Sequence, residues 1–596
     1  MSAAGTHRDG PVVLGVSAHF HDSAAALLVG GRLVAASHEE RYTRRKQDPA
    51  LPRHAVLDCL RQAGLRITDV DCVAYYEDPV KKLHRQLWAG LPDFPDSSAP
   101  ALFRLDADRP RRELRDLLGW EGRIEVVDHH LSHAASAYYY SGFDDSAVLT
   151  VDAVGEWATT TWGAGRGASL ELYDQVEFPH SLGLLYSAVT GYLGFEVNEG
   201  EYKVMGLAPY GKPRFADRLR QLVTVADNGT FTLALEYFDF QNPAGMLGER
   251  FRDLIGVPPR VPESTIDEVH CDLARSIQLV TEEVMLRMVD RAHRDTGSSN
   301  LCMAGGVALN VVAVRRVVEE GPFAQVFVQP AAGDAGGSLG CAAVAHQRLT
   351  GERPAQGRQR SALLGSVTPP NEIAKVLGAR PGTAFLDFRD DEPGLLAAVT
   401  DRLQTGKVIG WYHGREEFGP RALGSRSILA DPRGEGTRDR INASVKMREG
   451  FRPFAPAVLA ERASEHFKLD HASPFMLETC EVISPLALPA ITHVDRSARV
   501  QTVDERNGRF YRLISTFADR TGCPLLLNTS FNLRGEPIVH TPVDALLCFL
   551  RSDIDCLVLD DFVIDREALP EAWVSWFKGT RPPRQDKVSD SVYTLL

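Results

Sequence analysis

Residues 146–178 read SAVLTVDAVGEWATTTWGAGRGASLELYDQVEF. The apolar run SAVLTV predicts a strand that ends at Asp152, and the glycine-containing turn after it leads into two more strand-like runs, ATTTWG and LELYDQV. Residues 11–37 show the same order, with the strand-like run PVVLGVS, the polar turn AHFHDS, and two apolar runs joined by a Gly-Gly pair. The sequence therefore predicts an α/β protein with an internal repeat of architecture.

Two later segments follow a strand–glycine–helix pattern. In SNLCMAGGVALNVVAVRRVVEE the junction holds Gly305 and Gly306, and in AQVFVQPAAGDAGGSLGCAAVAHQRL the glycines surround Asp334. A helix that starts just after a strand leaves unpaired N–H groups and the positive end of its dipole above the sheet. Both junctions are therefore candidate ligand-binding turns.

The composition excludes several classes of protein. The 596 residues are 44% hydrophobic and 24% charged, as in globular proteins, and the formal net charge of -13 disfavours nucleic-acid binding. The nine cysteines include no CxxC pair, which predicts reduced thiols rather than disulfides or a zinc ribbon. We find neither a secretory signal nor an apolar run that could span a membrane. A cytoplasmic protein with no membrane partner is expected.

The sequence DHHLSH at 128–133 is a candidate metal site. On a helix, His129 and His133 project from one face and can bind one divalent ion, whereas His130 points elsewhere. Asp152 and Asp334 could complete the site. Such a donor set suits iron, zinc or manganese, and spacing alone does not choose between them. The alternative is a helix whose histidines are exposed or act as caps.

Three other segments of the N-terminal half carry candidate residues. In HFHD, His21 could act as a general base that Asp22 orients, although Asp also favours such turns for conformational reasons. In EGEYKVMGLAPYG, Lys203 could line a nucleotide or acyl pocket or lie in a surface loop. In EYFDF, Asp239 lies among aromatic residues that suit a polyhydroxylated or amino substrate, yet the segment also reads as an edge strand.

The C-terminal half concentrates cations beside glycine and proline in three segments, which favours an anion site. Arg421 lies in EEFGPRALGSRSILADPR, Lys446 and Arg452 lie in INASVKMREGFRPFAP, and Asn528 and Ser530 lie in LLLNTSFNLRGEP. Bidentate arginines, a lysine charge and hydroxyl donors are what phosphoryl groups require, although no GxxxxGK[ST] loop is present. A solvated basic face is the alternative.

Nine blocks in fixed order resemble a known family. They are HDSAAAL, EERYTRRK, DHHLSHAASA, NEGEYKVMGLAPYG, GGVALN, GDAGGSLG, GREEFGPRALGSRSILADPR, FRPFAPAV and LNTSFNLRGEPIV. Together they resemble the NodU/CmcH-type O-carbamoyltransferases from about residue 13 to about residue 565.

The resemblance implies an N-terminal duplicated actin-like domain of the ribonuclease-H type and a C-terminal domain like YrdC. The composition shifts toward proline, glycine and arginine between 351 and 382, where we place the connection. The expected parts are a leader at 1–10, the actin-like domain at 11–355, a linker at 356–375, the YrdC-like domain at 376–570 and a tail at 571–596.

The resemblance also implies a reaction. Carbamoyl phosphate and ATP, with Mg²⁺, would form carbamoyl adenylate at Arg421, Lys446, Arg452, Asn528 and Ser530. The carbamoyl group would then pass to a hydroxyl of a small natural product in the N-terminal domain. The residues expected in that domain are the metal ligands His129, His133, Asp152 and Asp334, the catalytic residues His21, Asp22 and Asp239, and the nucleotide-binding residues Gly305, Gly306, Asn310 and Lys203. Fe²⁺ is the preferred ion, with Zn²⁺ or Mn²⁺ as alternatives.

Two other functions compete with this one. A tRNA threonylcarbamoyl transferase-like enzyme would share the fold but would bind nucleic acid, which the net charge disfavours. A non-catalytic actin-like ATP-binding module would have no use for the metal ligands or the arginine cluster. For the assembly, the sequence leaves the oligomeric state open, and a homodimer is considered only because symmetric dimers are the commonest soluble oligomers.

Overall fold

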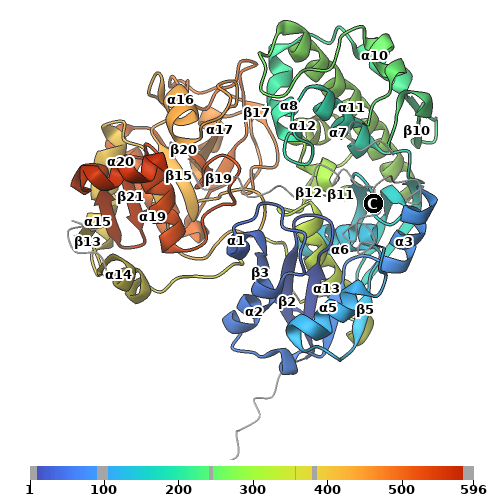
Figure 1. Cartoon of the computed structure of the whole chain (residues 1–596), viewed down its shortest axis with the longest axis horizontal. Coiled ribbons are helices and arrows are strands. Elements are labelled where there is room, and N and C mark those ends of the chain that lie inside the picture. Colours follow the sequence, from blue (N-terminus) through green and yellow to red (C-terminus); the bar gives the residue numbers. More distant parts are fainter. Residues whose placement is uncertain (1–9, 90–104, 241–245, 356, 379–384, 581–596) are drawn as a thin grey trace, which may run out of the picture. The chain divides into compact units, whose positions relative to one another are not determined.

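The computed structural model describes residues 10–89, 105–240, 246–355, 357–378 and 385–580. Within these residues the chain forms two compact units, whose elements are labelled in Figure 1. Unit 1 is made from 10–39 and 47–359, and unit 2 from 40–46 and 360–580. The short segment 40–46, which contains helix α1 (Glu40–Thr43), is thus part of the unit built by the C-terminal half of the sequence.

The first sheet of unit 1 has five strands in the order β3-β2-β1-β4-β5. Strands β1, β2 and β3 pair antiparallel, whereas β4 and β5 continue from β1 in parallel. The central strand β1 is buried at every position, which explains its continuous apolar sequence. The strands are β1 (Val12–Ser17), β2 (Ala24–Val29), β3 (Arg32–His38), β4 (Cys72–Tyr75) and β5 (Ile124–Val126).

The second sheet of unit 1 repeats this plan with the order β12-β11-β6-β7-β8. Strands β6, β7 and β8 pair antiparallel, and β11 and β12 continue from β6 in parallel. The repeated order and directions confirm the predicted α/β class and internal repeat. The strands are β6 (Asp145–Val151), β7 (Ala158–Arg166), β8 (Ser169–Glu177), β11 (Asn300–Ala304) and β12 (Gln325–Val328).

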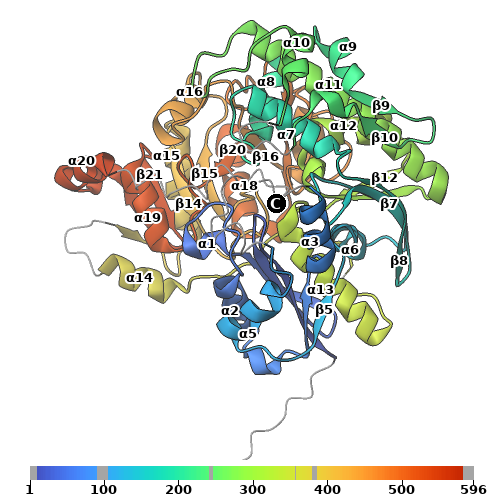
Figure 2. The ribbon, with the colours of Figure 1, turned by 45° about the vertical axis from the view of Figure 1, so that its right-hand side comes forward.

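Helices α6 (His129–Ser141) and α13 (Asp334–Thr350) pack against each other and against the sheets, as Figures 1 and 2 both show. The approach is close because a Cβ at Gly340 would lie 1.7 Å from the carbonyl oxygen of Ser132. On its other side α13 meets β1, where a Cβ at Gly15 would lie 1.9 Å from the carbonyl oxygen of Ser338. Glycine at these two positions lets the helices pack closely enough to bring their N-terminal ends together.

The other helices of unit 1 surround this centre. The longest of them, α11, has 29 residues and packs on α12 and β6. They are α2 (Arg53–Gln62), α3 (Pro79–Trp88), α5 (Arg109–Leu118), α7 (Leu182–Tyr192), α8 (Glu201–Leu207), α9 (Ala216–Leu219), α10 (Glu249–Ile255), α11 (Glu268–Thr296) and α12 (Val311–Glu320). A small hairpin pairs β9 (Val223–Val225) with β10 (Phe231–Leu233).

Unit 2 is built on a mixed sheet with the order β13-β22-β21-β14-β15-β20-β16-β19. The strands are β13 (Leu386–Asp387), β14 (Ile409–Tyr412), β15 (Arg426–Ala430), β16 (Ala455–Leu459), β19 (Gln501–Val503), β20 (Leu525–Ser530), β21 (Cys556–Leu559) and β22 (Phe562–Asp565). One large apolar core joins this sheet to its helices. The resemblance to YrdC stays a prediction.

The main helices of unit 2 and a short strand pair complete it. The helices are α14 (Pro370–Gly378), α15 (Glu392–Gln404), α16 (Thr437–Arg440), α17 (Ala463–His466), α18 (Arg509–Thr521), α19 (Pro542–Arg551) and α20 (Glu571–Gly579). The pair joins β17 (Cys480–Glu481) and β18 (Ser497–Ala498). Of the predicted tail, 571–579 form α20 and 581–596 lie outside the described residues, as do 1–9 of the predicted leader.

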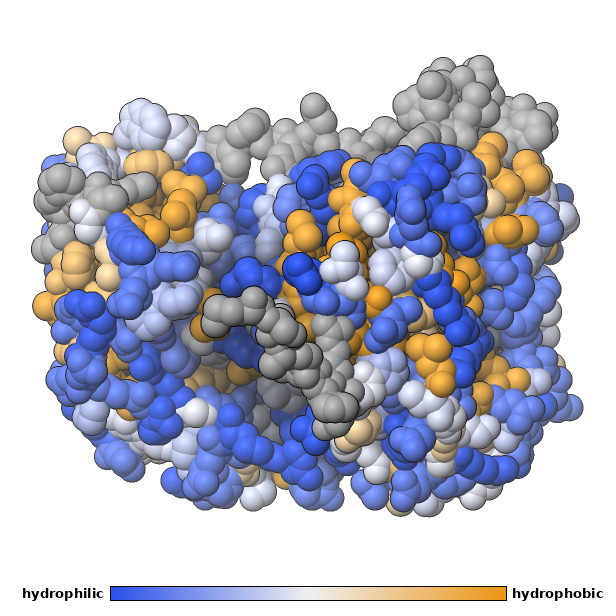
Figure 3. Space-filling model, turned by 90° about the horizontal axis from the view of Figure 1, so that it is seen from below, coloured by the Kyte–Doolittle hydropathy of each residue, from blue (hydrophilic) through white to orange (hydrophobic). Residues whose placement is uncertain are grey.

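Hydrophilic and hydrophobic side chains are interspersed over the face that Figure 3 shows. Among the described residues, no helix combines the length and the apolar character needed to cross a bilayer. All nine cysteines are free thiols, in line with the prediction of reduced cysteines.

Candidate active sites

Four buried side chains converge in unit 1. His129 and His133 lie one turn apart at the start of α6, and their Nε2 atoms are 3.0 Å from each other. Asp152, directly after β6, places Oδ2 3.1 Å from the first nitrogen and 3.0 Å from the second. Asp334, at the start of α13, places Oδ1 3.7 and 3.6 Å from them. One ligand atom from each residue therefore lies within 4.8 Å of all the others.

Backbone groups hold this cluster in place. The Oδ1 atom of Asp152 accepts hydrogen bonds from the N–H of Ala153 at 2.9 Å and from the N–H of Gly306 at 3.0 Å. A Cβ at Gly306 would lie 2.9 Å from the same oxygen, so only glycine fits there without a shift. The carboxylate of Glu156 accepts from the N–H of His129 at 2.9 Å, which satisfies a free donor at the start of α6.

The charges of the cluster fit a divalent cation. Burial lowers the pKa of His133, but hydrogen bonds to Asp152 and Asp334 raise it overall to about 9. Burial raises the pKa of Asp152, but its bonds to both imidazoles hold that pKa well below the ordinary value. Without a metal, the carboxylates therefore stabilise a proton on His133. Two neutral imidazoles and two carboxylates are a donor set for Fe²⁺, Zn²⁺ or Mn²⁺, which would take the place of that proton.

The neighbouring His130 stands apart from this cluster. Its Nδ1 forms a 2.6 Å hydrogen bond with the hydroxyl of Thr150, and burial holds its pKa well below the ordinary value. Helical periodicity therefore directs His130 away from His129 and His133, although all three histidines lie in the HHLSH motif.

The turn after β1 brings His21 beside the cluster. Its Nδ1 lies 3.1 Å from Asp22, and its Nε2 lies 4.0 Å from Oδ2 of Asp334. Asp22 adopts a left-handed backbone conformation with φ of 53°, which asparagine and aspartate tolerate better than most residues. Burial lowers the pKa of His21, but the charges of Asp334 and Asp22 raise it overall to about 9.

The four residues expected to bind nucleotide in unit 1 have different surroundings. Gly305 has a φ of 91°, and a Cβ there would lie 2.3 Å from the carbonyl oxygen of Val151, so together with Gly306 it shapes the turn beside Asp152. Asn310 caps α12 by accepting from the N–H of Ala313 at 3.1 Å. Lys203 lies on α8, with its Nζ 5.6 Å from the ring centroid of Phe195. A nucleotide-binding role for them remains a prediction.

The segment with Asp239 does not form the edge strand that was one interpretation of its sequence. Residues 235–237 form a 3-10 turn, and Asp239 itself is exposed, with its N–H donating to the carbonyl of Met246 at 2.9 Å. On either side of it, the rings of Phe238 and Phe240 stack at 5.0 Å. A catalytic role for this carboxylate stays a prediction.

A cluster of cations forms in unit 2. The predicted Arg421 and Arg452, together with Arg448, lie close enough to Arg499 that their charges lower its pKa. The largest cause of that lowering is burial, and the resulting pKa is well below the ordinary value. The Nε atom of Arg499 is buried without a hydrogen-bond partner among the described residues. Such an arrangement is unfavourable unless an anion binds among the guanidinium groups.

The sequence reasoning missed Arg499 as a site residue. It lies in the segment VDRSARVQ, which lacks the glycines and prolines that drew attention to the other cationic segments. Strand β19, which follows Arg499, pairs in parallel with β16, which follows Arg452. This pairing alone brings the two segments to the same part of the sheet. No local pattern in the sequence could have found it.

Lys446 lies buried near this cluster. Its ammonium donates to the hydroxyl of Ser530 at 3.1 Å, to Oδ1 of Asn532 at 2.7 Å and to the carbonyl of Asn532 at 3.1 Å. Burial lowers its pKa well below the ordinary value, and the charge of Arg448 lowers it further. Lys446 and Ser530 are thus brought together, as two of the predicted anion-binding residues.

The loop that carries Arg421 is held by side chains from other strands. Asn528 donates to the carbonyl of Ala422 at 3.3 Å and to Oε1 of Gln501 at 2.9 Å, and Gln501 donates to the carbonyl of Leu423 at 2.8 Å. Oε1 of Glu417 accepts from the N–H groups of Leu423 and Ser425 at 2.8 Å each. Asn528 is almost completely buried and therefore acts first as a support for this loop.

Comparison with known proteins places the chain in a family. The Carbamoyltransferase N-terminus family matches residues 12–90 and 119–343, and the Carbamoyltransferase C-terminus family matches residues 400–566. An uncharacterized protein of Synechocystis sp. is 44% identical, over 94% of this chain and 97% of its own length. The nodulation protein NolNO of Sinorhizobium fredii is 39% identical, over 93% of this chain and 80% of its own.

A named enzyme is also similar. The 3'-hydroxymethylcephem-O-carbamoyltransferase of Amycolatopsis lactamdurans is 29% identical, over 91% of this chain and 97% of its own. Among solved structures, component A of the Acidaminococcus fermentans (R)-2-hydroxyglutaryl-CoA dehydratase aligns over 57% of this chain and 99% of its own length. The TM-score of 0.33 and the identity of 14% are too low to support any conclusion. The family matches to both halves of the sequence show that the protein belongs to the carbamoyltransferase family and is a carbamoyltransferase enzyme.

Proposed function

We propose that this carbamoyltransferase is an ATP-dependent O-carbamoyltransferase with a separate site for each of two reactions. The observation that carries the proposal is the proximity of Arg421, Arg448 and Arg452 to the half-buried Arg499, whose Nε atom is shielded from solvent. Glu449 lies 3.6 Å from Arg452, and two phosphorylated substrates, carbamoyl phosphate and ATP, would supply further negative charge to this cluster. The His/Asp cluster of unit 1 would serve the transfer step.

In the first step, water would hydrolyse carbamoyl phosphate to carbamate and phosphate. The carbamate oxygen would then attack the α-phosphorus of ATP, forming carbamoyl adenylate and releasing pyrophosphate. Arginine guanidinium groups would bind the phosphoryl oxygens through paired hydrogen bonds, and Lys446 would add a point charge. Mg²⁺ would accompany ATP.

In the second step, an acceptor hydroxyl would attack the carbamoyl carbon of the adenylate, forming the carbamate ester and releasing AMP. His21 is the candidate base for the hydroxyl proton, and Asp22 orients its imidazole through Nδ1. With no metal, Asp334 and Asp22 keep the pKa of His21 at about 9, so it would be protonated at neutral pH. A cation at the carboxylates would oppose that shift and favour the neutral base.

The residues His129, His133, Asp152 and Asp334 would hold the divalent ion, with Fe²⁺ preferred and Zn²⁺ or Mn²⁺ as alternatives. When bound, such an ion supplies Lewis-acid polarisation of a carbonyl oxygen. For the acceptor, we propose a hydroxyl of a small natural product, because a similar enzyme is named for the hydroxymethyl group of a cephem.

The proposal is tested by incubating the purified chain with ATP, Mg²⁺ and carbamoyl phosphate and measuring pyrophosphate. Release that requires carbamoyl phosphate, with AMP appearing only when an acceptor is added or the adenylate hydrolyses, is the expected result. Formation of ADP in place of AMP would contradict the adenylate scheme. Tight and salt-sensitive binding of tRNA would instead favour a threonylcarbamoyl transferase.

A further inference from the structure

Residues 40–46, ERYTRRK, are separated in sequence from the rest of unit 2 by residues 47–359 of unit 1, yet they belong to unit 2. The segment lies within the part of the chain matched by the N-terminal carbamoyltransferase family, whereas the C-terminal family match covers only 400–566. Arg41 contacts the loop that carries Arg421, and Arg44 contacts the loop that follows Ser530.

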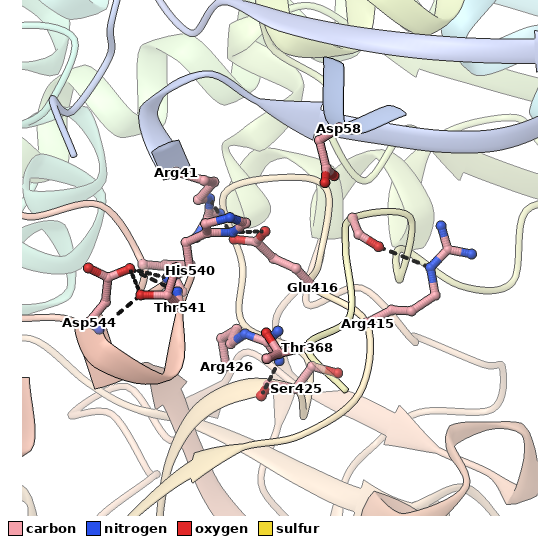
Figure 4. Close-up of polar contacts among 12 residues, drawn as sticks. Arg41, Asp58, Thr368, Arg415, Glu416, Ser425, Arg426, His540, Thr541 and Asp544 are labelled. Atoms are coloured by element: carbon pink, nitrogen blue, oxygen red, sulfur yellow. Dashed lines mark hydrogen bonds and ion pairs between the residues drawn. The ribbon is translucent and has the colours of Figure 1, made fainter. Parts of the chain in front are cut away.

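Arg41 contacts the loop that carries Arg421. Its side chain is 2% exposed, and its Nη2 donates to the carbonyl of Gly419 at 3.1 Å. Its Nε lies 3.6 Å from Oε1 of Glu416 in the same loop. Figure 4 shows Arg41 and Glu416 directed toward each other. A buried cation that bonds a backbone carbonyl two residues before Arg421 restricts where that guanidinium can lie.

The same contact continues to a second loop. The other oxygen of Glu416 lies 3.0 Å from Nδ1 of His540 (Figure 4). The ring of Tyr42 packs on the ring of His540, with centroids 4.3 Å apart. His540 directly precedes Thr541, the cap residue of α19. Arg41 and Tyr42 therefore both contact the Glu416–His540 pair that joins the two loops.

Arg44 contacts this second loop directly. Its Nη1 donates to the carbonyl of Ile538 at 2.7 Å and its Nη2 to the carbonyl of Pro537 at 2.8 Å. The loop begins just after Ser530 and Asn532, the two residues that accept hydrogen bonds from Lys446. The segment thus bonds to the loop that carries Arg421 and to the loop that follows Ser530.

We propose that residues 40–46 are a positioning element of the unit 2 anion site, in which Arg41 fixes the loop of Arg421 and Arg44 fixes the loop that follows Ser530. The inference rests on the proposed function for the identity of the anions. Neither arginine is assigned a contact with substrate. Both act through backbone carbonyls, and the effect is to keep the anion-binding groups at the spacing that two phosphorylated substrates need.

The backbone on either side of the segment is held in unit 1 beside the turn of His21. The N–H of Glu39 donates to the carbonyl of Ser23 at 2.9 Å, and the N–H of Ser23 donates to the carbonyl of Asp48 at 3.1 Å. The residues on either side of the segment are therefore held by backbone hydrogen bonds within unit 1.

The test uses the full-length chain with Arg41→Ala and Arg44→Ala, and with Arg45→Ala as the matched control because Arg45 is exposed. Carbamoyl-phosphate-dependent pyrophosphate release should lose ~10- to ~100-fold in kcat/KM in the first two variants, mainly through a higher KM. Arg45→Ala should stay close to the parent. Arg41→Lys, which retains a cation near Glu416 and one donor for Gly419, should recover part of the loss.

A purely structural role would lower the thermal unfolding temperature and leave the KM of the folded fraction unchanged, and that result would overturn the inference. So would unchanged kinetics in Arg41→Ala and Arg44→Ala. If either alanine variant does not fold, Arg41→Lys and the remaining variant decide the question. If the parent releases no pyrophosphate, the proposed function fails, and calorimetric affinity for inorganic phosphate then tests the positioning role alone.

Discussion

The His/Asp cluster of unit 1 and the arginine cluster of unit 2 differ in the sign of the ligand that each can bind. In unit 1, two imidazoles and two carboxylates lie within 4.8 Å, so a proton on His133 offsets part of the carboxylate charge and the cluster is suited to a cation. In unit 2, Arg421, Arg448 and Arg452 lie near the half-buried Arg499, and all four guanidinium groups carry a positive charge. The first cluster can therefore exist in a stable form without its ligand, whereas the second carries a cost until an anion arrives.

The largest expected effect comes from removing a ligand of the first cluster. His129→Ala should lower carbamoyl transfer by roughly 10³-fold, because several kcal/mol of Lewis-acid stabilisation would be lost. Pyrophosphate release in unit 2 should continue. Elemental analysis should show loss of the bound metal, and His130→Gln, which changes the neighbouring imidazole outside the cluster, should keep both metal and transfer. Loss of pyrophosphate release in His129→Ala would show that the two sites are not separate.

Replacing Arg499 of the second cluster should change activity and stability in opposite directions. Arg499→Met should lower kcat/KM for pyrophosphate release by ~10²-fold, yet raise the stability of the ligand-free protein by ~1 kcal/mol, because a half-buried charge among like charges is replaced by an apolar chain. Thermal unfolding without substrates measures the second effect.

Arg496→Met is the control for that variant, because Arg496 is exposed in the same segment. It should change neither quantity. A lower stability of Arg499→Met in the absence of anions would mean that the cluster is not under electrostatic repulsion.

The smallest expected effect is a pH dependence at the loop of Arg421. Burial raises the pKa of Glu416, but His540, Arg41 and Arg426 lower it overall to about 2. Because the folded pKa is below the ordinary value, Glu416 stabilises the fold above pH ~4.5, and this stability is lost as the pH falls toward about 2.

The difference in unfolding free energy between the parent and Glu416→Gln should therefore be on the order of 1–3 kcal/mol at neutral pH and should shrink over that acid range. Denaturant unfolding at a series of pH values measures it. The exposed Glu372→Gln provides the comparison and should show no such trend. A difference that stays constant down to pH ~2 would contradict the assignment.

Features set by neighbouring residues were predictable. The four-residue spacing of His129 and His133, the carboxylate of Asp152 at the end of an apolar strand, and the glycines before α12 and α13 all depend on local periodicity and turn chemistry. The duplicated strand order followed from comparing two such local patterns. The family resemblance, which was predicted from nine sequence blocks, was confirmed by the family matches to both halves of the chain.

Features that depend on packing between distant segments were not predictable. Arg499 joins the other arginines only through the strand order of the unit 2 sheet, Asn528 turns inward to support a loop, and residues 40–46 belong to the unit encoded far downstream. Helical and strand periods report which face of an element is buried, but they carry no information about which other element covers it. That choice is made by complementary packing and by the pairing of buried charges, which exist only once the chain has folded.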